Sequence, residues 1–277
     1  MTKEHPHFGP RLVASAAGAL RAALLIKPSP SIESAAPLIG EPGSVYVRAL
    51  EQHASLVKTL QYFGVKTTVL EPQSDDPFAC AAADGAVVLE DGAAIVRPSA
   101  MRRRTESTRI EHQFGEIDIP IAGHVVAPGL LDGSDVLLAG KTAFIGSGKS
   151  SNALGRAGFA SIARAHGLRV LEVALAPETR TLRSVANAVS EDTIVLAPHR
   201  VDETAFAGFK TITLEIGEEL GAGVITIGER RVIANLRYRT ALSQLAKAGI
   251  NVEAIDLYDF GKVGITPSML VLALKRD

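Results

Sequence analysis

Three short stretches of this sequence hold side chains that could bind or transform a small molecule. Asp132 and Asp135 flank a Gly-Ser turn directly before a strand-like run, and side chains at such a strand end commonly converge on a pocket. Residues 101–106 form a basic run, Met-Arg-Arg-Arg-Thr-Glu. Residues 145–152, Ile-Gly-Ser-Gly-Lys-Ser-Ser-Asn, lie between a strand-like and a helix-like segment, where a phosphate-binding loop would stand.

The glycine-rich stretch departs from a nucleotide-binding loop at one position. Such a loop needs a glycine five residues before Gly148, and the residue there is Ala143. A turn in which serine or asparagine caps the following helix accounts for the same residues. We therefore predict no nucleotide loop, and leave open a sulfate-like anion or a substrate carboxylate at this helix start.

The other reactive residue types each have a structural alternative. Cys80 lies four residues before Asp84, so in a strand the two side chains would share one face and the thiol could act as a nucleophile. The alternative is a small buried hydrophobic residue. For the 101–106 run, the alternative is a solvated helix face. The seven histidines form no HxxxH or HxH pair beyond His5 and His7, so we predict no metal and no other cofactor.

The composition limits the partner and the compartment. Lys and Arg number 29 and Asp and Glu 30, a balance that does not indicate a nucleic-acid or anionic-membrane partner. One cysteine excludes an internal disulfide framework. The apolar run 12–20 is too short to span a bilayer, and its lead-in is not a basic signal region. We expect a cytoplasmic protein with a small-molecule ligand, and leave a homodimer open.

Repeated strand pairs must position these residues. An apolar strand, a tight turn and a second apolar strand recur in 85–96, 135–145 and 223–233. After each comes a helix-like stretch and then another strand. The clearest helix has Leu242, Leu245 and Ile250 on one face and stops at Gly249.

Two weaker copies bring the count to about five. One starts near Ala23, and the other starts near Thr181 and has a helix near Glu203. Repetition on this scale favours a closed or stacked α/β architecture. No linker divides the chain, so we predict one domain over 23–277 after an N-terminal arm or short helix over 1–22.

At the Asp132 stretch the sequence resembles a known family, the dimethylarginine dimethylaminohydrolases. Residues 127–135 resemble the family's A-P-G-x-V-E-A-G-D, and 95–106 resemble its I-x-R-P…R-R-G-E segment. Further similar segments follow in family order at 49–53, 145–152, 181–184, 227–233 and 265–268. The resemblance implies a five-bladed pseudosymmetric α/β propeller (pentein) of ββαβ units, in the guanidino-group-modifying superfamily.

The resemblance also implies a site. In the family a cysteine attacks the guanidinium carbon, a histidine transfers protons, and acidic residues bind the guanidino nitrogens. This sequence has Ser268, or less well Pro267, at the cysteine position and Thr181 at the histidine position. The family's glutamate is replaced by Asp132, and of its Glu-Asp pair only Asp84 remains, after Ala83.

The ligand-binding residues carried over are Asp84, Arg103, Asp135, Lys149 and Ser150. The resemblance makes Arg103 a carboxylate-binding arginine, and Ser150, beside Lys149, replaces a second one. Paired acids match a guanidinium and arginine matches a carboxylate, so the expected ligand is small and zwitterionic or guanidino-bearing.

Two functions follow from these replacements. A serine hydroxyl needs an adjacent base, and Thr181 cannot be one. The first hypothesis is an enzyme, a hydrolase or lyase for C–N bonds of an arginine-like substrate, working by acid–base chemistry of Asp132 and Asp84 instead of a thiol. The second is a catalytically silent relative that binds such a ligand or a protein partner.

Overall fold

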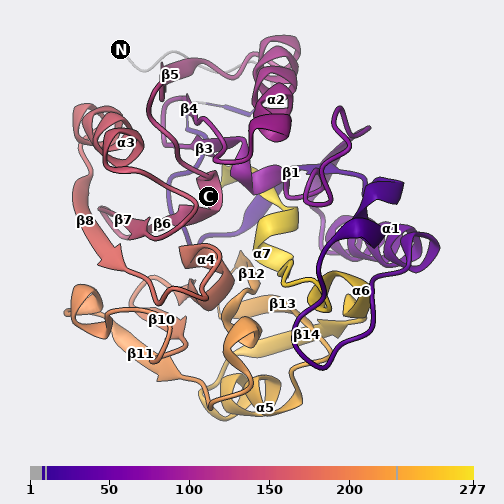
Figure 1. Cartoon of the computed structure of the whole chain (residues 1–277). Coiled ribbons are helices and arrows are strands. Elements are labelled where there is room, and N and C mark those ends of the chain that lie inside the picture. Colours follow the sequence, from indigo (N-terminus) through magenta and orange to yellow (C-terminus); the bar gives the residue numbers. More distant parts are fainter. Residues whose placement is uncertain (1–7, 10, 229) are drawn as a thin grey trace.

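Five three-stranded sheets surround a common centre (Figure 1), in a computed structural model that describes residues 8, 9, 11–228 and 230–277. In each sheet the middle strand runs antiparallel to one neighbour and parallel to the other. The sheets are β15 (Leu272–Arg276), β1 (Leu20–Ile26), β2 (Lys66–Leu70); β3 (Ala86–Val88), β4 (Ala93–Ile95), β5 (Ile121–His124); β6 (Val136–Ala139), β7 (Thr142–Ser147), β8 (Arg169–Ala174); β9 (Ala186–Ser190), β10 (Thr193–Leu196), β11 (Lys210–Thr213); and β12 (Ile225–Gly228), β13 (Arg231–Asn235), β14 (Asn251–Ile255).

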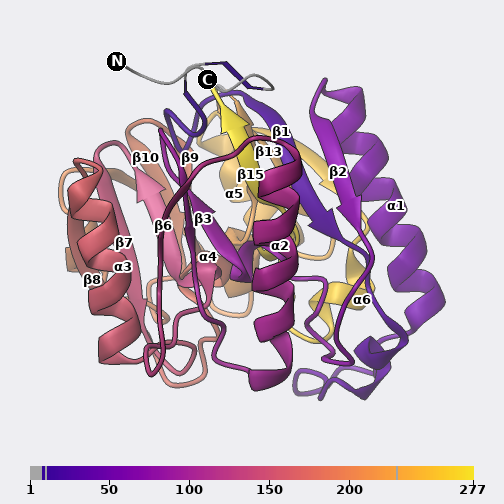
Figure 2. The same ribbon diagram turned by 90° about the horizontal axis from the view of Figure 1, so that it is seen from above.

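A helix connects the two parallel strands of each sheet, because a parallel pair needs a crossover. These helices lie outside the sheets (Figure 2). They are α1 (Tyr46–Tyr62), α2 (Arg104–Glu116), α3 (Ala153–Ala165), the 3-10 turn η5 (Glu203–Phe206) and α5 (Arg239–Lys247). Each unit is thus ββαβ, and the predicted five-bladed α/β propeller is confirmed. The C-terminal strand β15 completes the first sheet and closes the ring.

The local stop signals predicted from sequence act as expected, with one exception. Helix α5 ends before Gly249, which has φ +76°, a conformation that glycine adopts without strain. The helix expected near Glu203 is only the single turn η5, capped by Asp202, whose carboxylate accepts from the Thr204 N–H. Pro198 and Gly208 bound this connection and leave room for no more.

The N-terminal arm is not a helix in residues 8, 9 and 11–19. Leu12 and Val13 are buried, and Val13 forms a parallel bridge with Arg276. Strand β1 begins at Leu20, before the expected domain start, because the arm already pairs with the end of β15. The expected segment 1–7 lies outside the described residues. Within the described residues, no helix is long and apolar enough to cross a membrane.

Candidate functional site

One helical turn directly precedes the first strand of each unit, and these turns meet at the centre of the ring (Figure 1). They are η2 (Ala82–Asp84), η4 (Gly133–Asp135), α4 (Leu182–Val185), η6 (Glu219–Ala222) and α7 (Pro267–Leu270). Asp132 and Thr181 stand at the N-cap positions of η4 and α4, but neither side chain caps its own helix. Their polar groups are therefore not used for capping.

A salt bridge joins Asp84 and Arg103 inside this cluster. Arg103 Nη1 donates to Asp84 Oδ2 at 2.5 Å, and Nη2 donates to the Ala81 carbonyl at 3.0 Å. Both side chains are 1% exposed or less. Burial opposes the guanidinium charge, but the charge and hydrogen bond of Asp84 raise the pKa of Arg103 above its ordinary value. The two residues thus neutralise each other's charge.

Two further buried acids, Asp132 and Asp135, belong to η4. Burial, together with the charge of Asp84, raises the pKa of Asp132 to about 6, although its Oδ1 accepts from the Ser99 N–H at 2.7 Å. Burial also raises the pKa of Asp135 well above its usual range. Asp135 accepts from the Ser150 hydroxyl and from the Leu182 N–H. The protonation of Asp132 thus changes near pH 6.

Among the described residues, Ser268 has no hydrogen bond to a base. Its hydroxyl donates to the Arg183 carbonyl at 2.8 Å and lies 3.0 Å from the Thr266 hydroxyl. The Thr181 hydroxyl is buried and has no hydrogen-bond partner among the described residues. A serine is activated as a nucleophile by a neighbouring group that takes its proton. Here the Ser268 proton is held by a main-chain carbonyl, which cannot take it.

A pocket of about 520 Å³ lies on one side of the cluster. Its charged lining residues are Lys149, Arg180, Arg200, Arg237, Glu41, Glu178 and Glu219. Arg200 pairs with Glu178 at 2.6 Å and with Glu219 at 3.4 Å. Arg237 pairs with Glu41. Lys149 and Arg180 have no carboxylate partner in the described part of the chain, so this pocket, called here the large pocket, has two cations available to a ligand.

Arg180 separates the large pocket from the acid cluster. Its guanidinium lies 3.5 Å above the ring of Phe78, which also lines the pocket. Its charge lowers the pKa of Asp132 against the larger effect of burial. The Arg180–Phe78 contact therefore forms a boundary whose one side faces the pocket and whose other side acts on the acids.

A comparison with known proteins agrees with this architecture. No family model matches the chain. An N(G),N(G)-dimethylarginine dimethylaminohydrolase from Streptomyces coelicolor is 29% identical over 246 residues, 87% of this chain and 92% of the relative. One from Pseudomonas aeruginosa is 27% identical and covers 81% of this chain and 87% of the relative. The structure of a cysteine-to-serine variant of the Pseudomonas aeruginosa enzyme, complexed with citrulline, superposes with a TM-score of 0.82 at 24% identity, over 92% of this chain and 99% of that chain.

The chain is a dimethylarginine dimethylaminohydrolase-like protein. The long coverage of both chains supports this relation, since it extends across all five units instead of one shared motif. The resemblance stated from sequence is thereby confirmed for the family and for the fold.

In this dimethylarginine dimethylaminohydrolase-like protein, most of the predicted site residues lie in the buried cluster and not in the pocket lining. Asp84, Arg103, Asp132, Asp135, Thr181 and Ser268 are all 2% exposed or less, and Ser150 is 4% exposed. None of the seven lines the large pocket, whereas Lys149 does. The geometry therefore does not fit the expectation that Arg103 grips a ligand carboxylate, because Arg103 is already paired with Asp84.

Cys80 is buried, as its structural interpretation stated, but it is not in a strand. The chain around it forms turns that lead into η2, so the expected strand alternation with Asp84 is wrong. Burial raises the pKa of the Cys80 thiol to about 12. A protonated thiol is a poor nucleophile, so Cys80 has the chemistry of a small apolar residue.

The glycine-rich stretch is a helix start, as the capping interpretation predicts. Asn152 Oδ1 accepts from the Gly155 N–H at 2.8 Å and from the Leu130 N–H at 3.0 Å. Ser151 donates to the Gly146 carbonyl at 2.9 Å. These bonds account for Ser151 and Asn152, and Ser150 donates to Asp135. Within the described residues, no group of three or more His, Cys, Asp or Glu side chains could hold a metal ion.

Sequence reasoning missed the residues that shape the large pocket. Arg180 directly precedes the Thr181-Leu-Arg-Ser184 motif, and this adjacency was the available signal. Phe78, Glu41 and Arg237 come from three distant parts of the chain. Their convergence follows from the closure of the ring and has no local signature.

Proposed function

We propose that this chain binds a small amino-acid-like compound with a guanidino or ureido group in the large pocket, without hydrolysing it through a covalent thiol step. The observation that carries this proposal is the state of Ser268, whose hydroxyl donates to a main-chain carbonyl and has no imidazole or amine beside it in the described part of the chain. A covalent step needs a base at that position. Cys80 does not substitute for it, because its pKa is about 12.

The lining of the large pocket supports the ligand class. A volume of about 520 Å³ is in the range of small-molecule pockets. Arg180 and Lys149 can bind a carboxylate, a role that we assign to them in place of Arg103. Glu178 and Glu219 already bind Arg200, yet their oxygens can accept further hydrogen bonds from an ammonium or guanidinium group.

The related enzyme supports binding without a thiol. Its cysteine-to-serine variant was obtained in complex with citrulline. We propose that Ser268 of this chain corresponds to that serine, as the sequence resemblance implies. A serine there is compatible with a bound ureido amino acid in that enzyme. Because Ser268 does not line the large pocket, we take this parallel as support for the ligand class and not for a contact with Ser268.

Calorimetric titration with L-arginine, its methylated forms and L-citrulline tests the ligand, and a citrulline colour assay on the same samples tests turnover. We expect saturable binding of at least one compound and no product. Arg180→Ala should weaken binding by about 1.5–3 kcal/mol, the scale of a charge-assisted hydrogen bond. The matched control is Arg164→Ala, which removes an exposed arginine of α3. Equal affinities for the two variants would contradict the assignment of Arg180.

One observation favours a second candidate, an acid–base enzyme. Asp132 has a pKa of about 6, close to the value that suits a general acid or base at neutral pH. This candidate predicts turnover of an arginine-like compound whose rate changes around pH 6 and is lost in Asp132→Asn. Absence of turnover over the whole pH range excludes it.

A further inference from the structure

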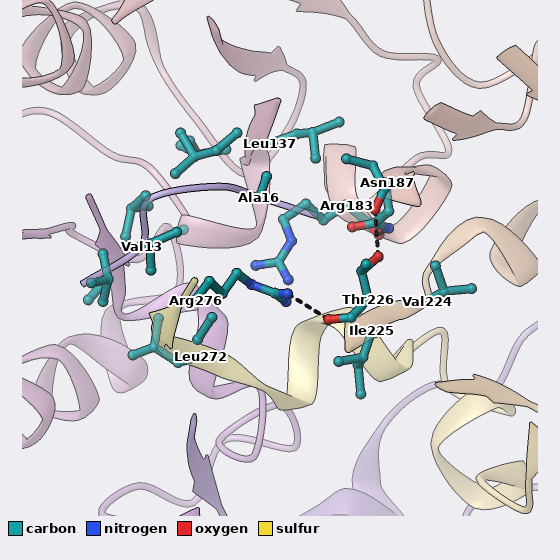
Figure 3. A pocket seen from close by; sticks show the side chains of 18 residues that line it. Val13, Ala16, Leu137, Arg183, Asn187, Val224, Ile225, Thr226, Leu272 and Arg276 are labelled. Atoms are coloured by element: carbon teal, nitrogen blue, oxygen red, sulfur yellow. Dashed lines mark hydrogen bonds between the residues drawn. The ribbon is translucent and has the colours of Figure 1, made fainter. Parts of the chain in front are cut away.

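A second cavity, of about 80 Å³, lies on the other side of the central turns from the large pocket. Figure 3 shows it from close by. Arg183 lines this small cavity, whereas Arg180 and Ser184 line the large pocket, so α4 separates the two. Most of the lining residues are apolar, from Val13 of the arm to Leu272 of β15.

Two arginines extend into this apolar space. Arg276 reaches it from β15 and Arg183 from α4, and both guanidinium groups are directed into the same volume (Figure 3). Arg276 Nη1 donates to the carbonyls of Thr226 at 2.6 Å and Gly18 at 3.0 Å. Both bonds use the same nitrogen, so Nε and Nη2 of Arg276 have no protein acceptor in the described part of the chain.

Arg183 is less well partnered. Its guanidinium has no hydrogen bond and no salt bridge to any described residue, although its carbonyl accepts from Asn187 and Ser268. The charge of Asp84 acts on it, but Asp84 is bound to Arg103. Thr226 and Asn187, the other polar side chains of the cavity, donate to main-chain carbonyls. The lining of the cavity therefore includes two cations and no carboxylate.

Two like charges that face each other in this setting repel each other. A charge taken out of water needs a counter-charge or hydrogen bonds. Burial lowers the pKa of Arg183 to about 10, and burial together with the charge of Arg183 lowers that of Arg276 to about 9. An anion between the two groups would remove both the repulsion and the unmet donors.

We propose that the small cavity is a binding site for one small oxyanion of the phosphate or sulfate class, held by Arg183 and Arg276. Planar guanidinium donors match the oxygens of such an anion in pairs. The volume is several times that of one water site but far below that of a small-molecule pocket. An amino acid therefore belongs to the large pocket, and this second site is independent of that ligand.

A melting experiment on the whole chain tests the proposal. Sodium phosphate is titrated into a large sulfonate buffer that keeps the ionic strength constant, with sodium chloride in a parallel series. The melting temperature should rise with phosphate as expected for a ligand that binds only the folded state. Arg183→Met should bind at least about tenfold more weakly, since a hydrogen bond to a charged group is lost. Arg164→Met, on the exposed face of α3, should behave as the wild type.

Arg183→Met has a second expected effect. In the buffer without phosphate it should melt higher than the wild type, because a partly buried, unpaired charge that repels Arg276 has been replaced by an apolar side chain. If it melts lower, Arg183 has a partner and the proposal is wrong. Phosphate stabilises proteins generally by exclusion from their surface, and an equal rise in all three proteins would show only that effect and overturn the site.

Two further outcomes are decisive. An equal saturable rise with chloride would make the site a halide site and overturn the oxyanion class. Should Arg183→Met fail to fold, calorimetric titration of the wild type with phosphate replaces it. Saturable heat that L-citrulline in the large pocket does not abolish supports the proposal, and absence of such heat overturns it.

Discussion

The acid cluster and the small cavity both bury arginine side chains, but they compensate the charge in opposite ways. In the cluster, Arg103 is bound to the carboxylate of Asp84 and to the Ala81 carbonyl. In the small cavity, Arg276 has only two main-chain carbonyls, and Arg183 has no partner among the described residues. The ring of short turns thus holds one arginine that is paired with a carboxylate and, next to it, two arginines that are not.

This difference indicates which part of the centre can accept a ligand. The Asp84–Arg103 salt bridge is a poor binding site for a further ion, because the existing partner would have to leave first. A cation without a counter-charge is stabilised by any anion that binds to it. We therefore regard Asp84 and Arg103 as an internal support and place ligand recognition at Arg180 and Lys149 in the large pocket and at Arg183 and Arg276 in the small cavity.

The largest effect is expected on breaking the Asp84–Arg103 pair. Asp84→Leu or Arg103→Met alone leaves a buried charge unpaired and should reduce the free energy of unfolding by about 3–5 kcal/mol. The double variant should lose much less free energy of unfolding than the two single variants lose together, because neither charge of the pair remains. Chemical denaturation of the four proteins measures the coupling. If the two single changes in the free energy of unfolding simply add in the double variant, Asp84 and Arg103 do not neutralise each other.

A surface pair supplies the control for that experiment. Arg21 donates to Asp277 at 2.6 Å, and the two side chains are 57% and 51% exposed. Arg21→Met should change the free energy of unfolding by no more than about 1 kcal/mol.

The sequence predicted the local part of this architecture and not its long-range part. Gly249 and Asn152 signal helix ends within a few residues, so their roles were predictable. The resemblance also selected the residues that gather in the cluster. That Arg103 would pair with Asp84 was not predictable, because their meeting depends on where η2 and α2 pack.

The small cavity was beyond sequence reasoning for the same reason. Arg183 lies in a central turn and Arg276 in the last strand, and closure of the ring by β15 brings them together. Asp277 follows Arg276 directly in the sequence, yet in the structure it pairs with Arg21 and Lys275. The sequence around the two arginines therefore gives no local signal that they share a cavity.

Protonation of Asp132 gives the next largest effect. Its pKa is about 6, against an ordinary aspartate value of about 3.9. Between these values the folded state holds a proton that the unfolded state has lost, so the contribution of this residue to stability falls as pH rises from about 4 to about 6. The total is on the order of 2–3 kcal/mol.

Asp132→Asn removes this dependence while its amide oxygen can still accept from the Ser99 N–H. The free energy of unfolding of the variant relative to the wild type should therefore increase between about pH 4 and pH 7. Denaturation curves at several pH values test this, with the exposed Asp75→Asn as the matched control. A constant difference across the range would mean that the acid cluster is less buried than described here.

The smallest expected effect concerns the close contact between η4 and η2, which lie between the acid cluster and the small cavity. Gly133 of η4 lines the small cavity, and a Cβ there would stand 2.2 Å from the Ala83 carbonyl oxygen and 2.9 Å from that of Ala86. Backbone cannot move aside as a flexible side chain does, so Gly133→Ala should lower the free energy of unfolding by about 1–3 kcal/mol. Gly115→Ala, in α2 with open space around it, should instead raise the free energy of unfolding by up to about 1 kcal/mol. The opposite signs separate crowding from helix propensity, because both changes add the same methyl group. If Gly133→Ala is as stable as the wild type, η2 and η4 can move apart. Close packing of these two turns would then not be what separates the acid cluster from the small cavity.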